Sequence, residues 1–203
     1  MLGKGLGCGR GLRGEGDVAG GDAVSAVLDQ LQSQNQPLFA LADAGRSAEV
    51  LTLLHSFDVE LRSLYEGDAE VQLGRSGPYL VSLPPDSDLL PALVRRGWGN
   101  AWVVILTADA SFADLRRHFR RLLMVKRQRD GGELYFRFYD PRVLRVFLPT
   151  CSPEQLPQLF GPVSAFLMED ESGAEVLRFA PDAEQQICER LTLDRVAQDG
   201  PYA

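Results

Sequence analysis

The sequence is poor in the side chains that build disulfide frameworks, metal centres and common catalytic sites. Its 203 residues include only three cysteines, Cys8, Cys151 and Cys188, and two histidines. The cysteines are odd in number and widely spaced, with no C-x-x-C pair, so they predict neither a disulfide framework nor a zinc site. An H-E-x-x-H helix, an EF-hand loop and a P-loop are also absent. We therefore expect no cofactor and no metal.

Long hydrophobic runs are missing as well. No stretch approaches the roughly 20 apolar residues of a membrane span. The first residues lack the apolar region and cleavage site of a secretory signal, so we expect a soluble, cytoplasmic protein without a membrane partner. The net charge is -7, from 21 basic and 28 acidic residues. This balance argues against nucleic acid as the main partner.

Glycine is distributed unevenly along the chain. Residues 1–21 hold nine of the twenty glycines, and such a segment has few side chains to offset the entropy lost on ordering. It contains a G-x-G-x-x-G string at residues 9–14, but no strand precedes the string, which favours chance over a dinucleotide site. We expect a disordered leader at 1–21, an α/β domain at 22–181, and a short helical or partly ordered tail at 182–203.

Helical and strand-like patterns alternate along the middle of the chain. Apolar residues at helical spacing predict helices at 22–35, from 47, at 87–97, from 111, at 141–148 and at 153–160. Alternating or continuous apolar runs predict extended segments at 38–42, 61–65, 71–73, 79–83, 102–106, 133–138, 163–168 and 176–179. The segments at 163–168 and 176–179 are predicted to pair as a β-hairpin. This order predicts an α/β fold with helices on both faces of a central sheet of mixed parallel and antiparallel pairing.

The run from Trp102 to Leu106 is the clearest strand. It is continuously apolar, as is typical of a strand covered on both faces. We expect it inside the sheet, with Val103 and Ile105 on one face and Val104 and Leu106 on the other.

The strongest charge feature is a basic helix that begins after Ser111. Residues 115–129 contain seven basic side chains and no acidic one. A solvated helix face is the simplest interpretation. The alternative is a binding surface for acidic groups, either on a partner or in residues 163–203, which carry nine acidic residues against three arginines. Nucleic acid is a poorer third interpretation, because interleaved aromatic residues are lacking.

The stretch from Arg137 to Val143 reads R-F-Y-D-P-R-V. Asp140 can cap the helix that follows, with Pro141 at its first position, and this structural role explains both residues. Capping leaves the two flanking arginines unexplained, so the stretch is either a partly buried charge network or a docking contact. The candidate partner-binding residues are Arg116, Arg117, Arg120, Arg121, Arg137, Tyr139, Asp140 and Arg142.

Catalysis receives little support from the sequence. Neither His55 nor His118 lies in a motif that pairs a histidine with a serine or cysteine nucleophile. The string Gly74-Arg75-Ser76-Gly77 lacks the G-x-S-x-G spacing of a nucleophile elbow. We expect the protein not to be an enzyme, and a hydrolase that uses one of the histidines is the least favoured alternative.

Several strings in order resemble a known family. They are F-A-L-A-D-A at 39–44, L-Y-E-G at 64–67, G-P-Y-L-V at 77–81, L-R-R-H-F-R-R-L-L at 115–123, F-R-F-Y-D-P-R-V at 136–143 and L-F-G-P at 159–162. Together they are similar to the domain of unknown function 4123. The resemblance implies an adaptor chaperone of type VI secretion in Gram-negative bacteria. Such a protein binds a toxic effector and helps load it onto the valine-glycine repeat spike trimer (VgrG) or its PAAR tip. A structural or regulatory subunit that binds only the spike is the alternative.

Overall fold

The computed structural model describes residues 18–126, 133–181 and 186–191. The predicted disordered leader and the end of the predicted tail lie mostly outside these residues. The helices are α1 (Val18–Gln32), α2 (Ala48–Leu54), α3 (Asp68–Leu73), α4 (Leu89–Gly97), α5 (Phe112–Leu122), α6 (Pro141–Phe147) and α7 (Leu156–Phe160), with 3-10 turns η1 (Gly74–Ser76) and η2 (Leu148–Thr150). The strands are β1 (Leu38–Asp43), β2 (Leu61–Ser63), β3 (Pro78–Leu83), β4 (Val103–Thr107), β5 (Met124–Lys126), β6 (Glu133–Tyr135), β7 (Ala165–Glu169), β8 (Val176–Pro181) and β9 (Gln186–Leu191).

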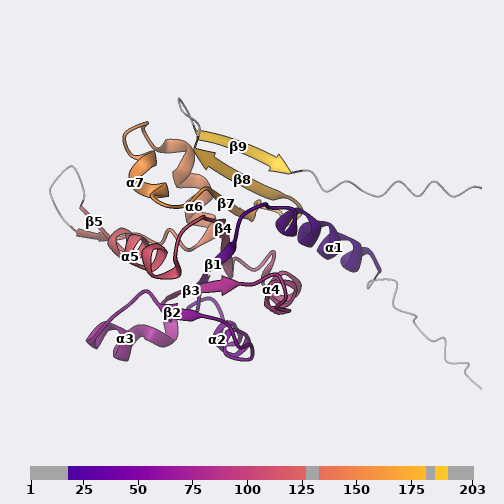
Figure 1. Ribbon diagram of the computed structural model, residues 1–203, viewed down its shortest axis with the longest axis horizontal. Helices are drawn as coiled ribbons and strands as arrows, with labels where there is room; N and C mark the ends of the chain where they lie inside the picture. Colours follow the sequence, from indigo (N-terminus) through magenta and orange to yellow (C-terminus); the bar gives the residue numbers. More distant parts are fainter. Residues whose placement is uncertain (1–17, 127–132, 182–185, 192–203) are drawn as a thin grey trace, which may run out of the picture.

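A seven-stranded sheet in the order β2-β3-β1-β4-β7-β8-β9 forms the centre of the molecule (Figure 1). Every pairing between its described strands is antiparallel. The α/β class is confirmed, but the expected mixture of parallel and antiparallel pairs is wrong. Continuous apolar runs are typical of parallel strands because both faces of such sheets are covered. Helices cover both faces of this antiparallel sheet as well, so its strands carry the same pattern. Strands β5 and β6 pair separately as a hairpin.

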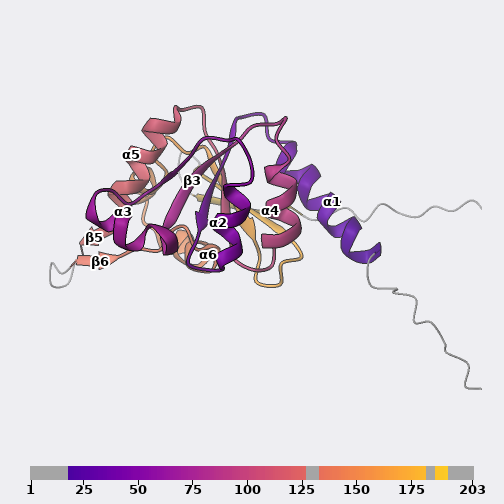
Figure 2. The ribbon, with the colours of Figure 1, turned by 90° about the horizontal axis from the view of Figure 1, so that it is seen from below.

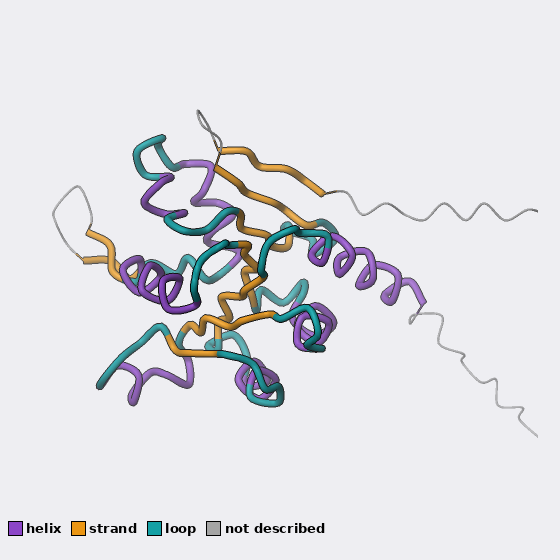
Figure 3. Tube along the Cα trace, in the orientation of Figure 1, coloured by secondary structure: helices purple, strands orange, loops and turns teal. Residues whose placement is uncertain are grey.

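Helices cover both faces of this sheet, as predicted. Helices α5, α6 and α7 lie on one side of the strand layer, and α1, α2 and α4 lie on the other (Figures 1 and 3). Two hydrophobic cores result, one on each face. None of the helices in the described part of the chain is long and apolar enough to cross a membrane.

Strand β4 separates the two cores and confirms the expectation for its side chains. Val104 and Leu106 belong to the core beneath α5, whereas Val103 and Ile105 belong to the core beneath α4. All four are at most 3% exposed. Because β4 pairs with β1 on one side and β7 on the other, it is an interior strand.

Helices α2 and α5 begin directly after Ser47 and Ser111, where the sequence predicted helices to start. The hydroxyl of Ser47 accepts from the backbone N–H of Glu49 at the start of α2. Ser111 accepts from the N–H of Asp114 and donates to its carboxylate at the start of α5. These bonds satisfy backbone donors that have no partner inside the helix.

The segment at 71–73, predicted to be extended, is the end of helix α3. Val71 and Leu73 are 86% and 49% exposed, so their spacing of two residues reflects no buried strand face. Asp68 and Glu70 lie in the first turn of this helix. Their negative charges favour a helix N-terminus.

Both ends of the predicted domain also differ from expectation. Helix α1 begins at Val18, before the predicted boundary at 22. Residues 186–191, predicted to be helical, form the edge strand β9. An antiparallel partner on β8 supplies its backbone with hydrogen bonds, and this tertiary pairing outweighs a weak local helical pattern.

Helix α4 ends at Gly97, as predicted, but the left-handed conformation that often terminates a helix is not at this residue. The positive φ angle lies two residues later, at Gly99 (φ 81°). Gly97 is buried beneath Trp102, whose Cβ would lie 3.0 Å from any β-carbon added there. Close packing therefore explains this glycine.

Candidate functional site

Three of the sequence strings that resemble a known family, at 39–44, 64–67 and 77–81, lie next to one another in the structure. Ala44, directly after β1, donates its backbone N–H to the carbonyl oxygen of Gly77 at 3.1 Å. A β-carbon on Gly77 would lie 2.2 Å from Cε2 of Tyr65, so only glycine allows this approach. Three strings that are far apart in the sequence thus contact one another at the end of β1.

A network of two arginines and two aspartates lies at this place, and we call it the arginine–carboxylate network (Asp43, Arg137, Asp140 and Arg142). Nη2 of Arg137 donates to Oδ2 of Asp43 at 2.5 Å and lies 3.8 Å from Oδ2 of Asp140. Arg142 holds Asp140 with two bonds, from Nε to Oδ1 at 3.0 Å and from Nη2 to Oδ2 at 2.7 Å. Such paired, charge-assisted bonds fix the plane of a guanidinium group.

The aspartates of the network are buried and the arginines are not. The side chains of Asp43 and Asp140 are 1% and 2% exposed, whereas those of Arg137 and Arg142 are 44% and 47% exposed. Burial acts to raise the pKa of Asp140, but the hydrogen bonds and positive charge of Arg142 outweigh it, and the pKa is lowered. Asp140 also accepts from the backbone N–H of Arg142 as the cap of α6. Both sequence interpretations of this aspartate, cap and network member, are therefore correct.

Tyrosines continue the network toward the β5–β6 hairpin. The Arg137 guanidinium lies 5.6 Å from the ring centroid of Tyr139. The hydroxyl of Tyr139 shares a 3.1 Å hydrogen bond with Tyr135, whose hydroxyl also bonds that of Tyr65. Burial raises the pKa of Tyr139. Tyr139 is 3% exposed, so it contacts Arg137 and Tyr135 from within the fold.

The basic helix α5 divides into two faces. Arg116 and Arg120 bind Glu66 with Nη1–Oε1 and Nη2–Oε2 distances of 2.8 and 2.5 Å. Nε of Arg116 also donates to the carbonyl oxygen of Ser63 at 2.9 Å. These bonds attach α5 to the edge strand β2 and to the segment after it, so Arg116 and Arg120 stabilise the fold.

The other two arginines of α5 face solvent. The side chain of Arg117 is 62% exposed and pairs with Asp114 one turn earlier at 2.6 Å. Arg121 is exposed and has no ion-pair partner among the described residues. Among the described acidic residues after 163, none pairs with either arginine, and the other acidic residues of this end lie outside the described part of the chain.

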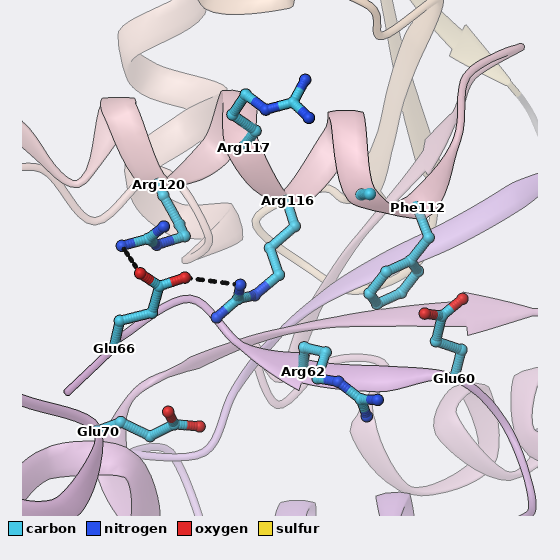
Figure 4. A pocket seen from close by; sticks show the side chains of 9 residues that line it. Glu60, Arg62, Glu66, Glu70, Phe112, Arg116, Arg117 and Arg120 are labelled. Carbon is cyan, nitrogen blue, oxygen red and sulfur yellow. Dashed lines mark hydrogen bonds and ion pairs between the residues drawn. The ribbon is translucent and has the colours of Figure 1, made fainter.

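A groove of about 650 Å³ runs between α5 and the segment around β2 (Figure 4). Glu66 lies between Arg116 and Arg120, and Phe112 points from α5 toward Glu60 and Arg62. The described lining contains no serine, cysteine or histidine. The groove therefore lacks a nucleophile with an adjacent base, and most of its charges already face an opposite charge.

The two histidines bind backbone carbonyl groups. Nε2 of His118 lies 2.9 Å from the carbonyl oxygen of Leu159, and burial lowers the pKa of its imidazole. Nδ1 of His55 lies 2.8 Å from the carbonyl oxygen of Leu51. In the described part of the chain, no group of three or more His, Cys, Asp or Glu residues could hold a metal ion.

Residues 38–158 match the family described as Domain of unknown function (DUF4123). The chain belongs to the DUF4123 family. This match covers more than half of the chain and includes the whole arginine–carboxylate network. Neither a curated protein nor a solved structure matches the chain.

Sequence reasoning named both arginines of the network but missed three of the groups that hold the site together. Asp43 and Glu66 are the ion-pair partners of Arg137 and of the inner face of α5. Tyr65 links the hairpin to the segment after β2. The available signal was their position in the family-like strings at 39–44 and 64–67.

Proposed function

We propose that this DUF4123 protein is a cytoplasmic adaptor of type VI secretion that binds a toxic effector and helps load it onto the VgrG spike or its PAAR tip. The arginine–carboxylate network carries this proposal. Buried Asp43 and Asp140 hold Arg137 and Arg142 in place, and each arginine keeps nearly half of its side chain exposed. Hydrogen-bond donors whose positions are fixed before binding lose little conformational entropy when a partner binds. This favours affinity for a protein partner.

Charge on α5 supports the same role. Arg117 and Arg121 extend into solvent at the helix surface. Exposed charges of one sign act mainly on the rate at which a complementary partner is met. An effector or spike protein with an acidic face would therefore associate faster with this surface.

The alternative is a structural or regulatory subunit that binds only the spike. The same arginines would serve it, and the number of partners distinguishes the two functions. A hydrolase has less support, because each histidine is engaged by a backbone carbonyl group.

Co-purification tests the proposal. The full chain, carrying an affinity tag, is expressed together with the effector and the VgrG protein encoded beside it. An adaptor retains both proteins after washing. Recovery of VgrG alone supports the spike-only subunit, and recovery of neither contradicts both functions. Arg95→Glu, on α4 at the opposite face, provides a charge-matched control for Arg142→Glu in the network.

A further inference from the structure

The central sheet has two edge strands of different length. Strand β2 has three residues at one edge, and β9 has six at the other. An edge strand presents backbone N–H and C=O groups that can pair with another chain, and folded proteins commonly cover these groups. In Figure 1, β9 is the outermost strand on its side of the sheet, and no described strand pairs with its outer edge.

Arginine side chains cover the edge at β2. Alternate residues of this strand point their backbone groups toward β3 and away from it, and those of Leu61, Ser63 and Tyr65 point away. Arg62 donates to the carbonyl oxygen of Leu61 at 2.8 Å. Arg116 donates to those of Ser63 and Tyr65 at 2.9 and 3.4 Å. These bonds occupy the acceptors that an added strand would use, so β2 is closed to strand addition.

The backbone of β9 is not covered in this way. The bond from the N–H of Asp170 to the carbonyl oxygen of Glu175 fixes which residues of β8 face β7. The alternate residues of β8 therefore face β9, and the register directs the backbone groups of positions 187, 189 and 191 toward β8. Positions 186, 188 and 190 point outward. Within the described part of the chain, no hydrogen bond occupies these outward groups.

A groove of about 550 Å³ runs beside this edge, between α1 and the last two strands. Helix α1 packs beside α4 (Figure 2), and its C-terminal half forms one wall of the groove. Glu189 on the other wall pairs with Arg178 at 3.3 Å and keeps 49% of its side chain exposed. Asp29 on α1 is exposed and forms no ion pair with a described residue. Negative charge therefore lies next to the open edge.

We propose that an extended segment of the effector adds to the sheet along the outer edge of β9 and places a lysine or arginine next to Asp29 and Glu189. The inference rests on the adaptor function proposed above and assigns that function a mode of binding. In strand addition, main-chain hydrogen bonds supply affinity and side-chain contacts supply specificity. Opposite charges that face each other on neighbouring strands stabilise the pairing.

A second copy of this chain fits the edge less well. In a two-fold antiparallel pair, residues of the same face lie opposite each other. The β9 positions that share a face with Glu189 are 187 and 191, an isoleucine and a leucine. Neither supplies a positive charge.

The open edge is distinct from the arginine–carboxylate network. Strand β9 lies four strands from β1 in the sheet, a separation of about 19 Å at the usual strand spacing. The network lies at the end of β1. An effector segment at β9 therefore leaves the network available to the spike protein, as an adaptor with two partners requires.

Three variants test the edge and the groove. Cys188→Pro removes one outward N–H and keeps the bonds to β8, and proline is tolerated at such edge positions. Asp29→Lys reverses the charge in the groove. Asp58→Lys makes the same change at an exposed residue before β2, at the opposite edge of the sheet. Thermal unfolding checks that each variant folds.

Calorimetric titration with the neighbour-encoded effector measures their binding. Cys188→Pro should bind at least about tenfold more weakly than the wild type. Asp29→Lys should bind about threefold more weakly or worse, and Asp58→Lys should stay within about twofold of the wild type. Wild-type affinity in Asp29→Lys would overturn the inference, and this variant leaves β9 itself unchanged.

Hydrogen exchange on the full chain provides a direct readout of strand addition. Bound effector should slow the exchange of the backbone N–H groups of Cys188 and Arg190. Unchanged exchange in β9 with effector bound would overturn the inference while leaving the adaptor function in place. A wild-type protein that binds no effector would contradict the function itself. A dimer of the protein alone that Cys188→Pro dissociates, seen by light scattering, would replace the effector by a second copy.

Discussion

Arg137 donates a hydrogen bond to Asp43 across 94 residues of sequence. The bond joins the last residue of β1 to the segment that leads into α6, and the aspartate is buried while the arginine is partly exposed. Removing the arginine leaves a buried carboxylate with the Gly45 backbone N–H as its remaining donor. This relationship makes the network a structural element, in addition to the recognition role proposed for it.

Arg137→Ala should therefore destabilise the free protein. We expect a loss of about 2 kcal/mol, below the range for fully buried pairs because Arg137 is partly exposed. Asp43→Asn combined with Arg137→Ala should cost less than the sum of the single changes, because no uncompensated charge remains. Urea unfolding of the three variants measures the coupling. Strict additivity would show that the pair contributes nothing.

Asp140 should make stability depend on acid pH. Its folded-state pKa is lowered below the ordinary value of 3.8, so the stabilisation is present above that value and is lost as the pH falls through the folded-state pKa. Asp140→Asn keeps the helix cap, since asparagine also caps well, but removes the charge. We expect the variant to be less stable than the wild type at neutral pH. Urea unfolding should show this difference shrinking as the pH is lowered from about 5 toward 2.

Arg116 and Arg117 are adjacent on α5 and should behave differently. Arg116→Ala removes bonds to Glu66 and to the carbonyl oxygens of Ser63 and Tyr65, and we expect a loss of about 1 to 2 kcal/mol. Arg117→Ala removes one exposed pair and should change stability by less than about 0.5 kcal/mol. Equal losses in denaturant unfolding would contradict the division of α5 into two faces.

Gly161 is expected to tolerate no side chain. Its φ angle is +52°, and an added β-carbon would lie 2.4 Å from Cε1 of His118. Gly99 has φ +81° with open space around it, so Gly99→Ala measures backbone strain alone, about 1 kcal/mol. Thermal unfolding should show a larger loss for Gly161→Ala than for Gly99→Ala. His118→Ala in the same chain should restore part of the difference.

Local signals in the sequence were sufficient for the starts of α2, α5 and α6 and for the interior strand. Ser111 and its bonding partner Asp114 lie within one turn, and the run around Ile105 is apolar on both faces. The direction of strand pairing and the ion-pair partners of charged residues depend on contacts between segments that are far apart in the sequence. Glu66 is 50 residues from Arg116, and no local pattern encodes that distance. The same reason explains the misassigned β9, whose strand conformation depends on pairing with β8.

Light scattering on a mixture of the full chain, the effector and VgrG tests the adaptor claim most directly. The account predicts a complex whose mass equals the sum of all three components. The effector and VgrG should elute separately when this chain is omitted. An effector that binds VgrG equally well without this chain would contradict the adaptor function.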